Sequence, residues 1–122
     1  MRACSESRTP STRPLTLWVA DSFLRRLLGV HARGFPQENE GLLITPCSAV
    51  HTFFLSQPLD VVFLDAKGNE CRCVRALAPN KVARAAGARM AVELPAGYCD
   101  RHGDYLARIH LAMSRSRLPQ RP

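Results

Sequence analysis

The 122-residue sequence has no hydrophobic run long enough to cross a membrane. A membrane-spanning helix needs about 20 consecutive, mostly apolar residues. The longest apolar stretches, such as Val61-Val62-Phe63-Leu64, end after a few residues in charged or turn-forming residues. We therefore expect no membrane span. Because 46% of the residues are hydrophobic, the chain can still bury a core and fold as a globular domain.

The amino-terminal segment lacks the apolar centre of a secretory signal. Its first 14 residues carry four charged side chains, whereas a signal peptide contains an apolar segment of about 7 to 15 residues. The five cysteines are an odd number. Cys71 and Cys73 lie too close together along a strand-like segment to bridge comfortably. We therefore expect a cytoplasmic protein with reduced thiols.

The net positive charge of the centre of the chain is small, although the formal net charge of the whole chain is +7. Residues 1–14 and 114–122 together hold +5 of this charge, and residues 15–113 contain 11 Lys/Arg against 9 Asp/Glu. A nucleic-acid-binding domain concentrates its basic residues on one face, where they displace counterions from phosphates. The near balance therefore predicts no nucleic-acid partner.

Few residues occur in patterns that hold a cofactor or a metal ion. The glycines stand singly, so the sequence contains no glycine-rich phosphate loop. Only Cys71 and Cys73 form a close cysteine pair, whereas structural zinc sites usually have paired C-x2-C knuckles. We expect no cofactor and no metal site, and we expect Cys71 and Cys73 to be packed thiols.

Short apolar segments separated by turn residues predict a protein made mostly of strands. We expect strands at residues 15–20, 41–45, 50–55, 59–65, 70–77, 89–94 and 105–111. Helical spacing predicts a short helix at 22–28, and residues 98–102 predict one helical turn. Residues 82–88 predict a loop or a single turn. The fold class is then α+β, mainly antiparallel β, with a curled or barrel-like sheet of about six strands and one or two short helices.

The same patterns predict a single domain at residues 15–113. The polar segments 1–14 and 114–122 are expected to be disordered tails, because their composition is poor in core-forming residues. We expect the protein to be a monomer.

Several separated motifs, taken together, resemble one family. The motifs are Glu40-Gly41-Leu42-Leu43, Pro46-Cys47, Val50-His51-Thr52-Phe53-Phe54, Pro58-Leu59-Asp60-Val61-Val62-Phe63-Leu64-Asp65, Gly68 and Glu93-Leu94-Pro95-Ala96-Gly97. From about residue 17 to about residue 111 the chain resembles the domain of unknown function 192 (DUF192) family. The resemblance implies a compact, mostly β domain that is widespread in bacteria and archaea, with no established activity, cofactor or catalytic residue.

The chain departs from the family pattern at two places. Many members carry a methionine and a basic residue where this chain has Leu55 and Ser56. Many also have a tryptophan-basic pair after the later loop proline, where Asn80-Lys81 stands here. Because of these departures, we do not expect this chain to share an anion contact that the basic residues of other family members could make.

Cys47 and His51 are the pair that could carry covalent chemistry. A thiolate beside an imidazolium is nucleophilic, but on a straight strand four residues span about 13 Å. A chain reversal at Pro46-Cys47-Ser48 would bring the two side chains closer, yet no third residue is an evident orienter of His51. We therefore expect a turn cysteine and a histidine bonded to backbone carbonyls. The alternative is a thiol-dependent hydrolase or acyl-transfer enzyme.

Asp60 is the polar residue that its neighbours explain least. It lies within an apolar run, where a carboxylate must be exposed at a sheet edge or paired with a basic group. Asp65 is five positions away, so the two carboxylates face opposite sides of a strand and are no acid/base pair.

Polar residues gather around the strand break near Pro58. We therefore expect a non-catalytic binding or assembly module, in which a cleft near residues 46–58 binds an unidentified small ligand or protein partner. The candidate binding residues are His51, Thr52, Ser56, Asp60 and Cys47.

Overall fold

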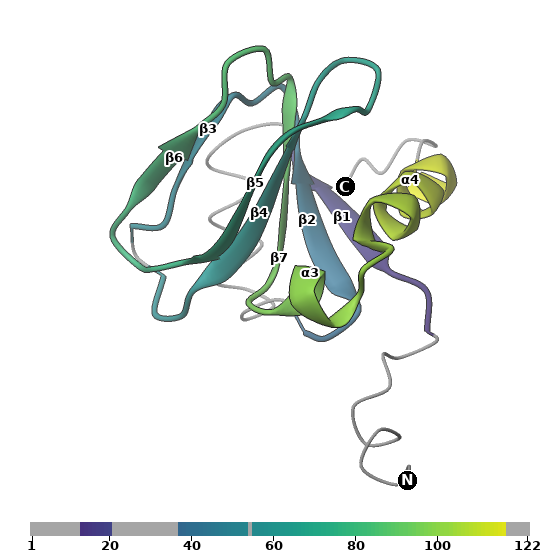
Figure 1. Cartoon of the computed structure of the whole chain (residues 1–122), viewed down its shortest axis with the longest axis horizontal. Helices are drawn as coiled ribbons and strands as arrows, with labels where there is room; N and C mark the ends of the chain where they lie inside the picture. Colours follow the sequence, from purple (N-terminus) through teal and green to yellow (C-terminus); the bar gives the residue numbers. More distant parts are fainter. Residues whose placement is uncertain (1–12, 21–36, 54, 117–122) are drawn as a thin grey trace, which may run out of the picture.

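The structure is a computed structural model in which residues 13–20, 37–53 and 55–116 are described (Figure 1). Their elements are β1 (Thr16–Ala20), β2 (Glu40–Ile44), β3 (Ala49–His51), β4 (Leu59–Leu64), β5 (Glu70–Leu77), β6 (Val82–Arg84), β7 (Met90–Pro95), α3 (Tyr98–Arg101) and α4 (Tyr105–Ser116). The helix expected at 22–28 lies outside the described residues. Neither described helix has the length and apolar character needed to cross a bilayer.

The strands form one five-stranded sheet and one two-stranded sheet. The larger sheet has the order β1-β2-β7-β4-β5, and the smaller one pairs β3 with β6. The pairing of β1 with β2 is parallel, and all the other described pairings are antiparallel. The larger sheet is open, with β1 and β5 at its edges. The α+β class with mainly antiparallel pairing is therefore confirmed.

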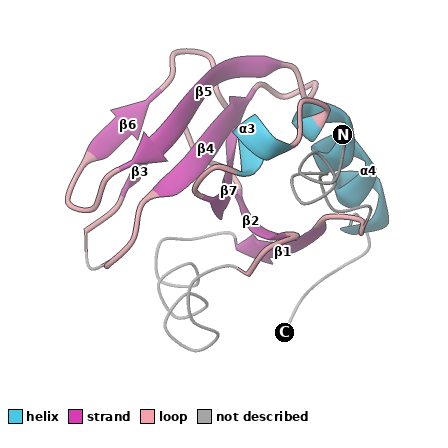
Figure 2. Ribbon diagram, turned by 60° about the horizontal axis from the view of Figure 1, so that its bottom comes forward, coloured by secondary structure: helices cyan, strands magenta, loops and turns pink. Residues whose placement is uncertain are grey.

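Each face of the larger sheet carries its own hydrophobic core (Figures 1 and 2). Val61 and Phe63 of β4 point to the face that packs with Val50 of β3 and Ala83 of β6. The alternating residues of β4, such as Val62, point to the other face and pack with α3 and α4. All six residues of β4 are buried, because an interior strand of a sheet covered on both sides has no wet face. This confirms the expected strand at 59–65.

The segment 105–111 forms the start of helix α4, so the expected strand there was wrong. Ile109 and Ala112 are buried against the sheet while His110 and Leu111 are exposed. This pattern has the 3.6-residue period of a helix and not the two-residue period of a strand. Helix α4 continues to Ser116, three residues past the boundary expected at 113.

Two smaller differences concern the two-stranded sheet. Residues 82–84 form strand β6, where a loop or turn was expected, because Ala83 packs inward between the exposed Val82 and Arg84. Strand β3 ends at His51, so only the start of the segment 50–55 is a strand.

The helical assignment of α4 predicts different effects for two nearby substitutions. Ile109 is fully buried, so Ile109→Ala should lower the free energy of unfolding by about 2–4 kcal/mol. Leu111 is 52% exposed, so Leu111→Ala should change it by less than about 0.5 kcal/mol. The measurement is a denaturant melt of each variant. Equal losses would contradict the helix, because a strand would place both side chains on one face.

Candidate binding site

Asp60 is buried in the middle of the fold and bonds to three backbone N–H groups. Its Oδ1 accepts from Ala76 at 2.9 Å and from Gly97 at 3.1 Å, and its Oδ2 accepts from Cys99 at 2.9 Å. The side chain has no exposed surface. The carboxylate therefore joins β4 to the edge strand β5 and to the start of α3. These contacts give Asp60 a structural role.

A bulge in β5 and the glycine before α3 place the three N–H groups next to the Asp60 carboxylate. Leu59 pairs with Leu77 and Val61 with Val74, so two residues of β5, Arg75 and Ala76, lie opposite the single residue Asp60. Ala76 has a φ of 52° at this bulge. On the other side, Gly97 precedes α3 with a φ of 89° and supplies no side-chain cap. Asp60 accepts the N–H groups that a capping side chain would otherwise accept.

Thr52 has a similar structural role at the small sheet. Its side chain is fully buried, and its hydroxyl donates to the carbonyl of Ala78 at 2.6 Å. The same oxygen accepts the N–H of Lys81 at 2.9 Å, and the Thr52 backbone bonds to Lys81 and Asn80. Thr52 therefore fixes the turn between β5 and β6.

Cys47 and His51 bond to backbone atoms of their own segment. The Cys47 thiol donates to the carbonyl of Ala49 at 3.0 Å, and the residue packs against the core beneath β3 and β6. Nδ1 of His51 accepts the N–H of Phe53 at 3.3 Å. In the neutral ring this makes Nε2 the protonated nitrogen. Ser56 is exposed in the segment that follows. A catalytic pairing of Cys47 with His51 stays a prediction.

An exposed patch lies on the outer face of the small sheet, beside the segment expected to bind. His51 stacks on Phe53 with ring centroids 4.7 Å apart, and it lies opposite Val82 in the strand register. Phe53 is 40% exposed and Val82 is 51% exposed. We call His51, Phe53 and Val82 the β3–β6 patch.

The surroundings of the β3–β6 patch are basic. Lys81 and Arg84 flank Val82 in the sequence and are exposed. From residue 71 to residue 89 the sequence has five Lys/Arg and no Asp or Glu, and residues 41–59 contain no charged residue. The charge balance of the whole central part conceals this asymmetry. A count over shorter windows would have revealed it.

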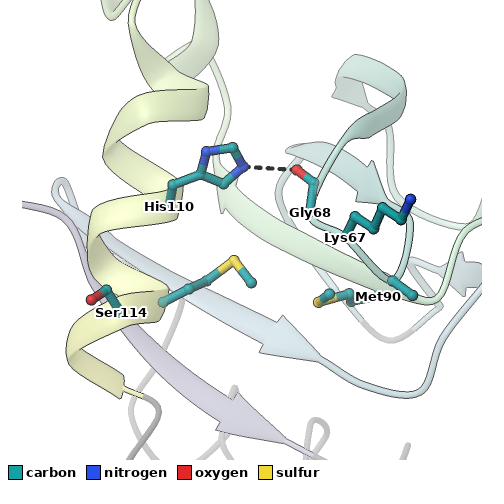
Figure 3. A pocket seen from close by; sticks show the side chains of 7 residues that line it. Lys67, Gly68, Met90, His110 and Ser114 are labelled. Atoms are coloured by element: carbon teal, nitrogen blue, oxygen red, sulfur yellow. Dashed lines mark hydrogen bonds between the residues drawn. The ribbon is translucent and has the colours of Figure 1, made fainter.

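A shallow groove opens on the opposite side of the larger sheet, between α4 and the turn that joins β4 to β5 (Figure 3). Its volume is about 340 Å³. The His110 ring donates from Nε2 to the carbonyl of Gly68 at 2.7 Å across this groove. The groove was missed from the sequence because 105–111 was expected to be a strand. Its lining residues are Ala66, Lys67, Gly68, Met90, His110, Met113 and Ser114.

No set of three or more His, Cys, Asp or Glu residues comes together as a metal site within residues 13–20, 37–53 and 55–116.

Burial raises the pKa of Tyr98, and the nearby Arg108 partly offsets this increase. In the neighbouring helix, the Arg108 guanidinium lowers the pKa of Asp104 through a hydrogen bond. These shifts come from packing and from helical ion pairs on the α4 side.

The geometry of Asp60 predicts a loss of stability in Asp60→Asn. An asparagine keeps one acceptor oxygen but turns an NH2 group toward one of the three N–H donors, which leaves a buried donor unsatisfied. The free energy of unfolding should fall by about 2–4 kcal/mol in a denaturant melt. Asp65→Asn is a control, because the half-buried Asp65 accepts N–H groups of its own turn through one oxygen, which asparagine keeps. A loss below about 0.5 kcal/mol for Asp60→Asn would contradict the structural role.

Comparison with solved structures finds the same fold in other proteins. Two crystal structures share the fold, each with a TM-score of 0.63 and 73% of this chain covered. One is a protein of unknown function from Novosphingobium aromaticivorans, 19% identical and covered over 69% of its length. The other is a Sinorhizobium meliloti protein provisionally described as a transcription regulator, 21% identical and covered over 74%. At these identities the likeness shows the fold alone.

Comparison with curated proteins gives no significant match. The sequence profile of DUF192, described as an uncharacterized ACR, matches residues 5–104. This match spans most of the chain, including every strand described in the structure. The chain belongs to the DUF192 family.

Proposed function

We propose that the chain is a non-catalytic binding module whose β3–β6 patch binds an acidic, apolar segment of a protein partner. The observation that carries the proposal is the stacked pair of the half-buried His51 and the exposed Phe53 beside the exposed Val82. An exposed face of a small sheet can bind a peptide segment, whereas a small molecule usually needs a concave site. Two of the three patch residues, His51 and Phe53, lie in the segment 46–58 that the sequence singled out for binding.

Apolar exposure supports this role for the patch. Phe53 and Val82 are two of the four large hydrophobic side chains that are exposed among the described residues. His51 and Val82 are brought together by cross-strand pairing, and the Phe53 ring stacks on His51. Clusters of exposed apolar residues mark interaction sites more often than single ones do. Aromatic side chains also contribute strongly to protein interfaces.

Charge supports an acidic partner. Lys81 and Arg84 lie beside Val82, and residues 71–89 contain no carboxylate that would neutralise them. Complementary charges at the rim of an interface speed association and set the orientation of the partner. Because such charges are exposed, salt should weaken the complex.

The groove next to α4 supports a small-ligand site less well. It is wide open, and the protonated nitrogen of its histidine is already bonded to the carbonyl of Gly68. The thiol-enzyme alternative gains no specific support, because the Cys47 thiol donates to a backbone carbonyl. We also propose a cytoplasmic location. The four described cysteines are free thiols, as that compartment would keep them.

The proposal predicts binding of an acidic aromatic peptide to the β3–β6 patch. The probe is the blocked tripeptide Glu-Phe-Glu, titrated into the isotope-labelled full chain while amide chemical shifts are recorded. Shifts should be largest at His51, Phe53 and Val82, and they should shrink with added salt. The blocked tripeptide Lys-Phe-Lys should cause much smaller shifts, because the rim of the patch is cationic.

A pair of matched variants separates this patch from general hydrophobic binding. Val82 and Leu111 are 51% and 52% exposed, but they lie on β6 and on α4. Val82→Ser should weaken the binding of Glu-Phe-Glu at least about threefold, whereas Leu111→Ser should leave it unchanged. Shifts that centre on the groove at His110 would contradict the proposal in favour of a small-ligand site there. Equal effects of both variants would also contradict it.

A further inference from the structure

Two cysteines and an arginine meet on the α3 side of the larger sheet, away from the β3–β6 patch. Cys99 is buried at the start of α3, and the half-buried Cys73 of β5 packs against the same hydrophobic cluster. Nε of Arg75 donates to the Cys73 sulfur at 3.5 Å. Nη1 of Arg75 donates to Asp100, the residue after Cys99, at 2.6 Å. Arg75 therefore bridges the segments that carry the two thiols.

The Asp60 hydrogen bonds explain why these segments lie together. Its Oδ1 holds the N–H of Ala76 in β5, and its Oδ2 holds the N–H of Cys99 itself. Cys73 pairs with Val62, whose side chain points to the α3 face. Arg75 follows two positions later on the same side of the strand. A single carboxylate thus fixes both backbones that carry the sulfur atoms.

The environments of the two thiols differ. Burial raises the pKa of Cys99, and the neighbouring Cys73 thiol and Asp60 carboxylate raise it further. The two thiols are neighbours in the fold, because the Cys73 side chain packs against the hydrophobic cluster that contains Cys99. Cys99 is therefore protonated and shielded, whereas Cys73 is partly open to solvent and has a guanidinium at its sulfur. Nucleophilic cysteines occur in settings of the second kind.

We propose that Cys73 and Cys99 form a peroxide-responsive dithiol, in which Cys73 is oxidised first and Cys99 closes an intramolecular disulfide. The Cys73 sulfur attacks one oxygen of hydrogen peroxide, the O–O bond breaks, and the thiol proton leaves with the other oxygen as water. Cys73 is then a sulfenic acid. The Cys99 sulfur attacks the Cys73 sulfur, the S–O bond breaks, and the hydroxyl leaves with the Cys99 proton as a second water.

The role of Arg75 follows from the charge that develops in the first step. The attacking sulfur carries negative charge, and the guanidinium donates a hydrogen bond to it. Arg75 is therefore a positioning residue for this oxidation. Cys71 is in a different setting, because the register shift between Phe63 and Leu64 leaves it exposed, without a partner in β4.

The test is peroxide oxidation of the full chain, followed by intact-mass measurement and peptide mapping without reduction. The expected product has lost two hydrogen atoms and contains a Cys73–Cys99 cross-link that dithiothreitol reverses. In Cys99→Ala, dimedone should label Cys73, because the sulfenic acid can no longer be resolved. In Arg75→Gln, cross-linking should be about tenfold slower, whereas Arg72→Gln is a control because it leaves the Cys73 contact in place.

Other products would overturn the proposal. A cross-link between Cys71 and Cys73, or one that involves Cys47, would show that exposure and not the Arg75 environment selects the thiol. Dimedone labelling that is equal at Cys71 and Cys73 would have the same meaning. Mapping of the unmodified chain decides the outcome even if Cys99→Ala fails to fold. An unchanged mass at peroxide concentrations that oxidise free cysteine would also overturn it.

Discussion

The carboxylate of Asp60 is the interaction on which the arrangement of the α3 side depends. A buried charge is unfavourable unless hydrogen bonds replace its water, and here three backbone N–H groups do so. These donors come from the bulge of an edge strand, which interrupts the ladder, and from the beginning of a helix, where backbone N–H groups have no partner within the helix. Removing the carboxylate would leave the N–H groups of the β5 bulge and of the start of α3 without their acceptor.

Several contacts follow from this anchor. The bulge at Arg75 and Ala76 places Arg75 beside Cys73 and Asp100. The start of α3 places Tyr98 in the core, where its ring lies 4.2 Å from that of His102. The buried His102 in turn contacts Glu38 at 3.3 Å, in the turn before β2. The chain thus uses one polar group to join β4, β5 and α3.

The two sides of the larger sheet therefore have separate polar anchors. Thr52 holds the small sheet, and Asp60 holds α3. In the sequence, Asp60 attracted attention because it lies within an apolar run, and Thr52 because it is one of the polar residues near the strand break at Pro58. In the structure both bond to the backbone, and the two proposed sites lie next to them. The β3–β6 patch adjoins Thr52, and the Cys73–Cys99 pair adjoins Asp60.

Strong local patterns made most of the sheet predictable. The apolar run of β4, the glycine turn after it and the hairpin partner β5 were all expected from the sequence. Helix α4 was missed because its first seven residues alternate much as a strand does, and burial against β1 and the sheet decides the period. Strand β6 was missed because a strand of only three residues gives little pattern in the sequence. Its pairing with β3, which the sequence does not show, makes it a strand.

The candidate site was predictable only in part. The sequence predicted that Asp60 is exposed or paired with a basic group, whereas the structure buries it against three backbone N–H groups. Donors from such distant segments cannot be identified without the fold. The exposure of Phe53 and Val82 also depends on tertiary structure, because Phe53 lies in a segment expected to be a strand and Val82 lies in one expected to be a loop or a turn. The absence of acidic residues between 71 and 89 can be read from the sequence by counting charge over short windows. The count over the whole of residues 15–113 conceals it.

Hydrogen exchange at the Ala76 amide tests the Asp60 anchor most directly. Ala76 is exposed on an edge strand and lies in a bulge, so its N–H depends on Oδ1 of Asp60 for protection. The account predicts that the amides of Ala76 and Cys99 exchange about as slowly as amides in β4, because they open only when the fold opens. Exchange of the Ala76 amide at the rate of an exposed loop would contradict the account.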